Sequence, residues 1–234
     1  MLQVKSFTFN ILGANCYVIW EEGQQHCVIV DPGMYRDFEE TAMTDFLSAE
    51  GLTPDGILLT HGHFDHTWGV SLLVARYGCP VYMSDADRET ARMGASFFHQ
   101  LSFMKQPKTF SYQDISDGQV LSLGGTKWTV ISCPGHSPGC VSYYAADEGI
   151  LLTGDTLFAG AIGRTDLEGG DYDALMKSLL EKLMVLPGDT DVLPGHGERS
   201  SIAVESANNP FLLPFNESPQ EAWRKEDGLS LHRT

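Results

Sequence analysis

Hydrophobic and polar residues follow two patterns along the first third of the chain. The segments QVKSFTF, CYVIW and HCVIVDPG are β-branched or aromatic and are separated by Gly, Asn and Pro, which predicts strands joined by turns. Apolar residues at helical spacing run from about Asp37 to Ala49, and TWGVSLLVARYG predicts a second helix that ends at Gly78. Between them GILLT predicts a buried strand, and PVYMSD predicts another one after the second helix.

The second half of the chain repeats this order. QVLSLGG, TKWTVISCPG, CVSYYAAD and EGILLTGD predict four strands with turns between them. DYDALMKSLLEKLMVL predicts a helix with Asp171 as its N-cap, TDVLPGHG a strand that runs into a loop, and RSSIAVESANN a helix. Segment 86–118 looks irregular, and the aromatic residues of 94–112 are either ordinary core residues or the wall or lid of a pocket.

Two sets of strands, each followed by helices, indicate an α+β protein. We expect two mixed β-sheets packed face to face with helices on their outer faces, an αββα sandwich. No composition shift marks a linker between the halves. We therefore predict one domain over residues 1–212, followed by a C-terminal tail or short helix over residues 213–234.

The charge and cysteine content narrow the class of protein. With 15 Lys and Arg against 31 Asp and Glu, the net charge of −16 argues against a nucleic-acid partner. The chain has no apolar run of about 18 residues, so we expect no membrane span. Its N-terminus lacks the pattern of a signal peptide, and its five cysteines are irregularly spaced without a CxxC motif. These features predict a cytoplasmic protein, either a monomer or a homodimer.

Candidate chemistry gathers where the apolar runs end. Seven imidazole or carboxylate groups follow four predicted strands: His61, His63, Asp65, His66, His136, Asp155 and His196. A single histidine at a strand end is usually just a hydrogen-bonded polar residue. That interpretation does not account for an HxHxDH motif together with two Pro-Gly-His turns, because loops at strand ends are where a rigid scaffold positions functional groups. The pattern therefore predicts a metal site.

The spacing divides these groups into two sets. His61 and His63 lie at positions i and i+2 of an extended loop and point to the same side, so they can bind one ion with His136. The start of a helix near Thr67 turns Asp65 and His66 toward a second ion, which His196 would complete, while Asp155 could bridge the two. Ligands that are all imidazole or carboxylate favour two Zn²⁺ ions per chain and also admit Fe²⁺ or Mn²⁺.

Four motifs in order carry a resemblance to a known family: THGHFDH, PGHSPG, LLTGDTLF and LPGHG. Over roughly residues 3–212 the chain resembles the metallo-β-lactamase superfamily and, within it, glyoxalase II (hydroxyacylglutathione hydrolase) and its short bacterial relatives. The resemblance implies that all seven groups are metal ligands. It also places Asp31 of VDPG in the family's first motif, where it would orient the ligands. The alternative for Asp31 is a plain turn aspartate before Pro-Gly.

The resemblance also implies a reaction. A bridging hydroxide between two metals, oriented by the catalytic residue Asp65, would cleave a small-molecule thioester such as a hydroxyacylglutathione (S-lactoylglutathione-like), or a similar activated ester. Zinc β-lactamases carry Cys at the position of Asp155, which argues against antibiotic hydrolysis. Full-length glyoxalase II has a helical domain after its last metal ligand, whereas only 38 residues follow His196 here, so glutathione specificity is open.

Three alternatives remain. The loop LFAGAIGRTDLEGG resembles short glyoxalase II-like hydrolases, and its GRTD also resembles persulfide dioxygenases, which use the same fold with one iron. A lactonase and a metal-binding scaffold without turnover are the others. In this loop Arg164 either anchors the substrate or pairs with Asp166.

Overall fold

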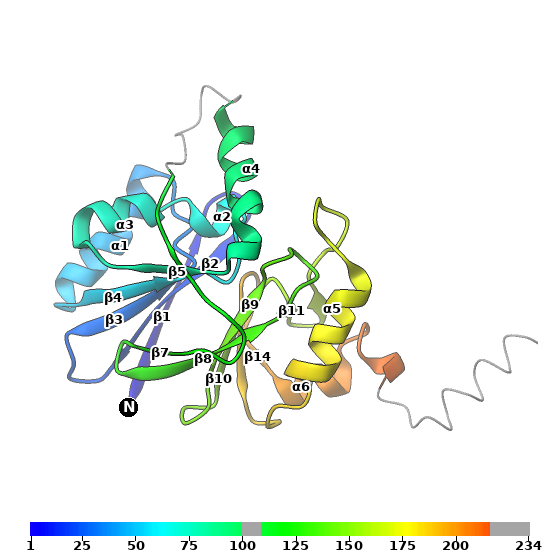
Figure 1. The fold of residues 1–234 in the computed structure, drawn as a ribbon. Coiled ribbons are helices and arrows are strands. Elements are labelled where there is room, and N and C mark those ends of the chain that lie inside the picture. The colour runs from blue at the N-terminus through cyan, green and yellow to red at the C-terminus, as the bar shows by residue number, and fades with distance from the viewer. Residues whose placement is uncertain (100–108, 216–234) are drawn as a thin grey trace, which may run out of the picture.

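The structure is a computed structural model that describes residues 1–99 and 109–215 (Figure 1). Its first sheet has six strands in chain order, in which β1 to β3 are antiparallel neighbours and β3 to β6 are parallel neighbours. The strands of this sheet are β1 (Leu2–Phe9), β2 (Ala14–Glu21), β3 (His26–Val30), β4 (Thr53–Leu58), β5 (Val81–Met83) and β6 (Gln113–Asp114).

The second sheet has the order β14-β13-β10-β9-β8-β7, and only its β10–β13 pair is parallel. Both sheets are therefore mixed, as predicted. The strands of the second sheet are β7 (Val120–Leu123), β8 (Thr126–Ser132), β9 (Val141–Ala145), β10 (Ile150–Gly154), β13 (Asp191–Pro194) and β14 (Ser200–Ser201), and a separate hairpin consists of β11 (Leu157–Phe158) and β12 (Ala161–Ile162).

The two sheets face each other across a common core. On β2, the side chains of Tyr17 and Ile19 enter this core, where they join Trp128 and Tyr143 of the second sheet. Val18, which lies between them in the sequence, packs instead into the cluster beneath the first helices. The two-residue period of a strand explains this division, because successive side chains point to opposite faces. Strands that are apolar on both faces are thus buried on both faces.

Helices cover the outer face of each sheet (Figure 1). Met43 and Leu47 of α1 and Leu73 of α3 pack on the first sheet, whereas Leu175 of α5 and Ile202 of α6 pack on the second. This arrangement confirms the predicted αββα sandwich. The helical elements are α1 (Asp37–Ala49), α2 (Phe64–Thr67), α3 (Val70–Tyr77), η1 (Asp85–Asp87), α4 (Arg88–His99), α5 (Tyr172–Ser178) continuing into η2 (Leu179–Leu183), α6 (Ile202–Asn208) and η3 (Leu213–Phe215).

Helix ends follow the sequence signals closely. Helix α3 ends at Gly78, whose left-handed φ of 67° is easily adopted by a glycine. Asp171 caps α5 by accepting a hydrogen bond of 2.9 Å from the Ala174 amide. One expectation was wrong in part: the first part of segment 86–118 is not irregular but forms α4. A short turn, η1, of which only Asp87 is buried, leads directly into this helix, and no clear sequence signal marks the start of the helix.

The predicted pocket wall or lid at 94–112 lies largely outside the residues whose side chains the structure describes. Two of its aromatic residues, Phe110 and Tyr112, pack against the core beneath the first helices, as ordinary core residues do. Residues 216–234 of the predicted tail are likewise outside the described part, and the boundary at 212 stays a prediction.

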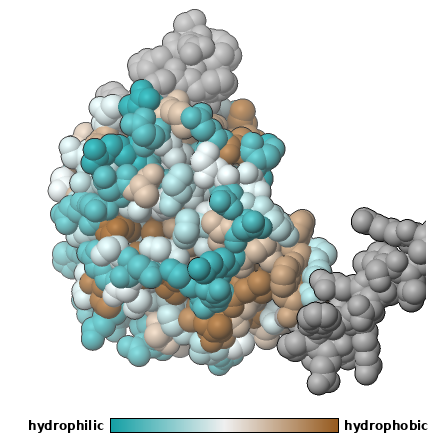
Figure 2. Space-filling view, turned by 45° about the vertical axis from the view of Figure 1, so that its right-hand side comes forward, coloured by the Kyte–Doolittle hydropathy of each residue, from teal (hydrophilic) through white to brown (hydrophobic). Residues whose placement is uncertain are grey.

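The surface seen in Figure 2 is largely hydrophilic, with smaller hydrophobic areas between the polar ones. Among the described residues, no helix is both long and apolar enough to cross a bilayer.

Candidate metal centre

The loops that carry the seven predicted groups leave the two sheets at the ends of their strands. His61 and His63 follow β4, and α2 then begins immediately. His63 still has an extended backbone (ψ 146°), whereas Asp65 and His66 lie in the single turn of α2. This is the change from extended chain to helix that the sequence predicts. His136 follows β8, Asp155 follows β10 and His196 follows β13.

A first group brings together the ring nitrogens of His61, His63 and His136. His63 Nδ1 and His136 Nε2 lie only 2.9 Å apart. Two nitrogen ligands of one tetrahedral zinc ion lie about 3.3 Å apart, so the spacing suits a shared cation. His61 Nε2 is buried and has no hydrogen-bond partner, which is a costly state for a polar atom. A cation would satisfy it.

A second group consists of Asp65, His66 and His196. His66 Nε2 lies 3.2 Å from His196 Nε2, and His196 Nε2 lies 3.3 Å from Asp65 Oδ2. The three donors thus converge from α2 and from the loop after β13. The structure brings together the same residues that the spacing in the sequence assigns to a second metal.

Asp155 lies between the two groups. Its Oδ2 is 3.5 Å from His136 Nε2 in the first group and 3.5 Å from His196 Nε2 in the second. Its Oδ1 is 3.4 Å from His66 Nε2 and, although buried, has no hydrogen-bond partner. A carboxylate in this place is able to contact cations on both sides.

The electrostatics of the centre also suit cations. Burial and the neighbouring imidazoles lower the pKa of His61 and bring the pKa of His63 to about 4, so both rings are neutral at neutral pH, the form that binds metal. Burial raises the pKa of the Asp155 carboxyl, even though three histidines oppose this effect. A buried carboxylate that is hard to ionise is stabilised by a nearby cation.

In the second group the carboxylates dominate the electrostatics. Burial disfavours the charged form of His66, but Asp155 and Asp65 outweigh it and raise its pKa to about 10, so a cation bound by this group would have to displace a proton from the ring. Burial likewise opposes ionisation of Asp65, and His66 and His196 outweigh it and hold the pKa of Asp65 well below its ordinary value. Asp65 therefore carries a negative charge throughout the neutral range.

Asp31 contacts both His66 and the start of the ligand loop. It accepts hydrogen bonds from the amide of Thr60 (2.8 Å) and from its hydroxyl (2.6 Å), and it lies 3.0 Å from His66 Nδ1. With Nδ1 engaged in this way, His66 directs Nε2 toward the centre. Asp31, His61 and His66 also form a third group whose ligand atoms lie close to one another. The Asp31 carboxylate, however, lies at Nδ1 of His66, whereas Nε2 of that ring faces the other proposed ligands.

Sequence reasoning missed three further residues that hold the ligand loops. Asn10 donates from Nδ2 to the carbonyl oxygen of Asp65 (2.9 Å), and Asn15 donates to the carbonyl oxygens of Pro194 and Gly197, on either side of His196. The third is Asp87, which is fully buried. No local motif marks any of them, because their partners are 25 to 182 positions away in the chain.

A cavity of about 640 Å³ opens onto the centre. Its floor contains residues of both groups, and its walls are mainly apolar, formed by Leu12, Phe158, Ala161, Ile162 and Leu167.

Arg164 also lines this cavity, but its guanidinium forms two contacts with Asp166, of 2.7 and 2.8 Å. The internal loop pair considered for Arg164 is therefore formed. Its carbonyl oxygen has a separate role, since it lies 2.8 Å from His136 Nδ1 and leaves His136 Nε2 for the centre.

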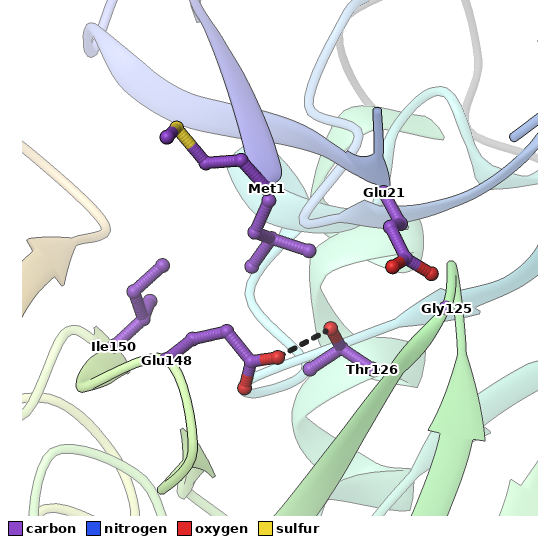
Figure 3. A pocket seen from close by; sticks show the side chains of 7 residues that line it. Met1, Glu21, Gly125, Thr126, Glu148 and Ile150 are labelled. Atoms are coloured by element: carbon purple, nitrogen blue, oxygen red, sulfur yellow. Dashed lines mark hydrogen bonds between the residues drawn. The ribbon is translucent and has the colours of Figure 1, made fainter. Parts of the chain in front are cut away.

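A second cavity, of about 370 Å³, lies between the start of β1 and the turns beside β8 and β10 (Figure 3). Its lining includes Glu21 and Glu148, and Thr126 Oγ1 donates to Glu148 Oε1 over 3.4 Å. It contains no histidine, so the cavity beside the histidine cluster is the better candidate for catalysis.

An αββα sandwich with a cluster of histidines and aspartates at its strand ends defines a metallo-hydrolase-like protein. Comparison with protein families agrees, since residues 10–196 match the model of the metallo-beta-lactamase superfamily. The chain belongs to this superfamily.

Curated relatives place it among hydrolases. The chain is 36% identical over 207 residues to the probable metallo-hydrolase YqgX of Bacillus subtilis, with 87% of this chain and 94% of that protein covered. It is 31% identical over 208 residues to the hydroxyacylglutathione hydrolase GloC of Haemophilus influenzae, with 85% and 92% covered.

Solved structures share the fold over nearly their whole length. The structure described as BLEG-1 B3 metallo-beta-lactamase superposes with a TM-score of 0.79 at 35% identity, covering 90% of this chain and 99% of that one. The structure of TTHA1623 in a di-iron-bound form has a TM-score of 0.78 at 33% identity, with 89% and 100% covered.

Proposed function

We propose that this protein is a dinuclear metallohydrolase that cleaves a thioester, or a similarly activated ester, of a small molecule. In this proposal the first group of histidines would hold one cation, the second group would hold the other, and Asp155 would be available to both. The observation that carries the proposal is the position of the Asp155 carboxylate, with Oδ2 3.5 Å from His136 Nε2 and Oδ1 3.4 Å from His66 Nε2.

The cations and the side chains around the centre would have different roles in the reaction. A bound pair of cations would supply Lewis acidity toward the substrate carbonyl and a water molecule acidic enough to react at neutral pH. Asp65 stays ionised, because its pKa is held low, and can accept a hydrogen bond from the attacking water and aim it. Three of the imidazoles have a second hydrogen bond through Nδ1, namely His61 with Thr60, His66 with Asp31 and His136 with the carbonyl oxygen of Arg164, and these bonds keep their Nε2 atoms directed at the centre.

A thioester fits the residues present. A thiol has a pKa of about 8.5, so a thiolate leaves without needing a strong general acid, and the proposed centre contains no obvious one. The apolar walls formed by Leu12, Phe158 and Ile162 favour an apolar substituent beside the reacting carbonyl. The relative described as a hydroxyacylglutathione hydrolase supports a thioester, whereas the pairing of Arg164 with Asp166 leaves less positive charge to bind the carboxylates of glutathione.

Zinc is the proposed metal. The donor set of imidazoles and carboxylates without thiolate suits it, and the di-iron form of the related structure makes iron the competing candidate.

One experiment tests both the metal and the reaction. Elemental analysis of the purified protein is combined with assays of S-lactoylglutathione, an uncharged N-acetylcysteamine thioester, a lactone and a β-lactam. The β-lactam is included because a related structure is described as a lactamase. We expect two zinc ions per chain and fastest turnover of a thioester. One iron per chain with oxygen consumption on glutathione persulfide would instead indicate a dioxygenase, and no hydrolysis at all would refute the proposal.

A further inference from the structure

Asp87 occupies an unusual place for a carboxylate. It ends the short turn η1 and is fully buried. Its Oδ2 accepts hydrogen bonds from the Gly62 amide (2.6 Å) and the Ser137 hydroxyl (2.7 Å), and its Oδ1 accepts one from the Gly139 amide (2.6 Å). A buried carboxylate is stable only when donors replace the lost water, and here three short hydrogen bonds do so.

The three donors come from two separate ligand loops. Gly62 lies between His61 and His63, and Ser137 and Gly139 follow His136 directly. The Asp87 side chain therefore ties together the two loops that supply all three nitrogens of the first group. The loops approach each other closely, since His63 Nδ1 and His136 Nε2 lie 2.9 Å apart. Two lone pairs that face each other at this distance repel unless a proton or a cation lies between them.

The backbone of Asp87 packs closely against both ligand loops. A Cβ atom on Gly62 would lie 2.8 Å from the carbonyl oxygen of Asp87, and one on Gly139 would lie 2.5 Å from its amide nitrogen. Both positions therefore need glycine, because a side chain on either loop would push η1 away. Thr90 Oγ1, one turn further along, lies 3.4 Å from Asp87 Oδ1. The carboxylate is thus held from its own helix as well as from both loops.

We propose that Asp87 is a positioning residue for the first metal. It contacts neither substrate nor the proposed ions. Instead, it sets the distance between the His61–His63 loop and the His136 loop, and through that distance the affinity of the three-histidine group for its cation. This inference rests on the dinuclear site proposed above. It predicts selectivity: loss of the Asp87 charge should weaken the first metal and not the second.

Zinc affinity of metal-stripped protein, measured by competition with a chromophoric chelator, tests the selectivity. Asp87→Asn is made in two backgrounds: His196→Ala, which impairs the second group, and His136→Ala, which impairs the first. In the His196→Ala background we expect zinc to bind about 10- to 100-fold more weakly, the usual effect of losing a hydrogen bond behind a ligand. In the His136→Ala background we expect a clearly smaller change, because Asp87 hydrogen-bonds no residue of the second group.

Glu205→Gln provides a matched control. Glu205 is also a buried carboxylate with three donors, namely the Gly160 amide, the Ser200 hydroxyl and the Asn209 side-chain amide, but none of these donors lies in the His61–His63 loop or the His136 loop. Glu205→Gln should lower the melting temperature of the metal-stripped protein while leaving the zinc affinity of the first group unchanged.

Each other outcome is decisive. Equal weakening in both backgrounds, or an Asp87→Asn protein that differs from wild type only in melting temperature, would overturn the role of Asp87. If Asp87→Asn does not fold, Ser137→Ala removes a single donor and should weaken the first metal in the same direction by a smaller factor, and an unchanged affinity would overturn the proposal. Wild-type protein that binds no zinc would instead refute the dinuclear site itself.

Discussion

At the scale of single residues, the centre contains a strained position that its neighbours hold in place. Asp31 has a φ of 48°, a left-handed conformation that residues other than glycine rarely adopt and that costs about 1–3 kcal/mol. The hydrogen bonds from Thr60 and the contact with His66 Nδ1 require the carboxylate to be there. These contacts hold the strained residue in place beside a proposed ligand.

Asp65 gives the sharpest test at this scale. Asp65→Ala removes both a proposed ligand and the group that aims the water, so we expect kcat/KM for the thioester to fall by about 10²- to 10⁴-fold. The second zinc should be lost as well, measured as metal content after gel filtration. Asp147→Ala, at an exposed aspartate far from the ligand loops, is the control and should retain wild-type rates. Near-normal activity of Asp65→Ala would show that its assigned role is wrong.

At the scale of elements, helix α5 supports the turn that carries His136. The Asp171 amide, at the start of the helix, donates to the carbonyl oxygen of Gly135 over 2.8 Å. A Cβ atom on Gly135 would lie 2.4 Å from the backbone of Leu175 in the same helix. Turn and helix are therefore packed backbone to backbone, and a shift of one moves the other.

Gly135→Ala tests this contact. The clash, together with a φ of 144° that disfavours a side chain, should destabilise the protein by about 1–3 kcal/mol in urea unfolding and weaken zinc binding by displacing His136. Gly149→Ala is the matched control, since Gly149 also has a positive φ (64°) but open space around its Cβ position. It should cost about 1–2 kcal/mol, from the left-handed φ alone, and leave zinc affinity unchanged. Equal effects on zinc binding would contradict the argument.

At the scale of the whole molecule, the five cysteines are all buried and none is in a disulfide. Burial raises the pKa of each thiol, to about 12 for Cys27 and about 11 for Cys133. The reactive thiolate is therefore rare at pH 8, and the rest of the fold shields the sulfur atoms.

We expect the native protein to react slowly with Ellman's reagent at pH 8 and to release five equivalents of thiol only after denaturation in guanidinium. Because no thiolate belongs to the proposed metal groups, zinc content should be the same before and after brief exposure to the reagent. A thiol that reacts at once in the native protein, or zinc that is lost with it, would contradict this picture. Because all five cysteines are buried, no exposed thiol is available to react quickly.

Some elements could be predicted from the sequence and others could not. Alternation on β2 and the caps of α3 and α5 were readable because each depends on residues within a few positions of one another. Helix α4 was not, because it continues from the turn η1, whose buried residue Asp87 is held by contacts with distant loops. For segment 94–112, where a pocket wall or lid was one expectation, the structure describes no side chains between residues 94 and 108, so that expectation stays a prediction.

The sequence by itself determined the fold class, the family and the residues that converge on the centre, since ligand type and i, i+2 spacing at strand ends are local properties of the chain. Their assignment as metal ligands stays a prediction. Only the tertiary structure decided that Asp155 lies between the two groups, that Arg164 pairs with Asp166, and which residues hold the ligand loops. The physical reason is that hydrogen bonds such as those of Asn15 and Asp87 join distant segments and leave no periodic trace in the sequence.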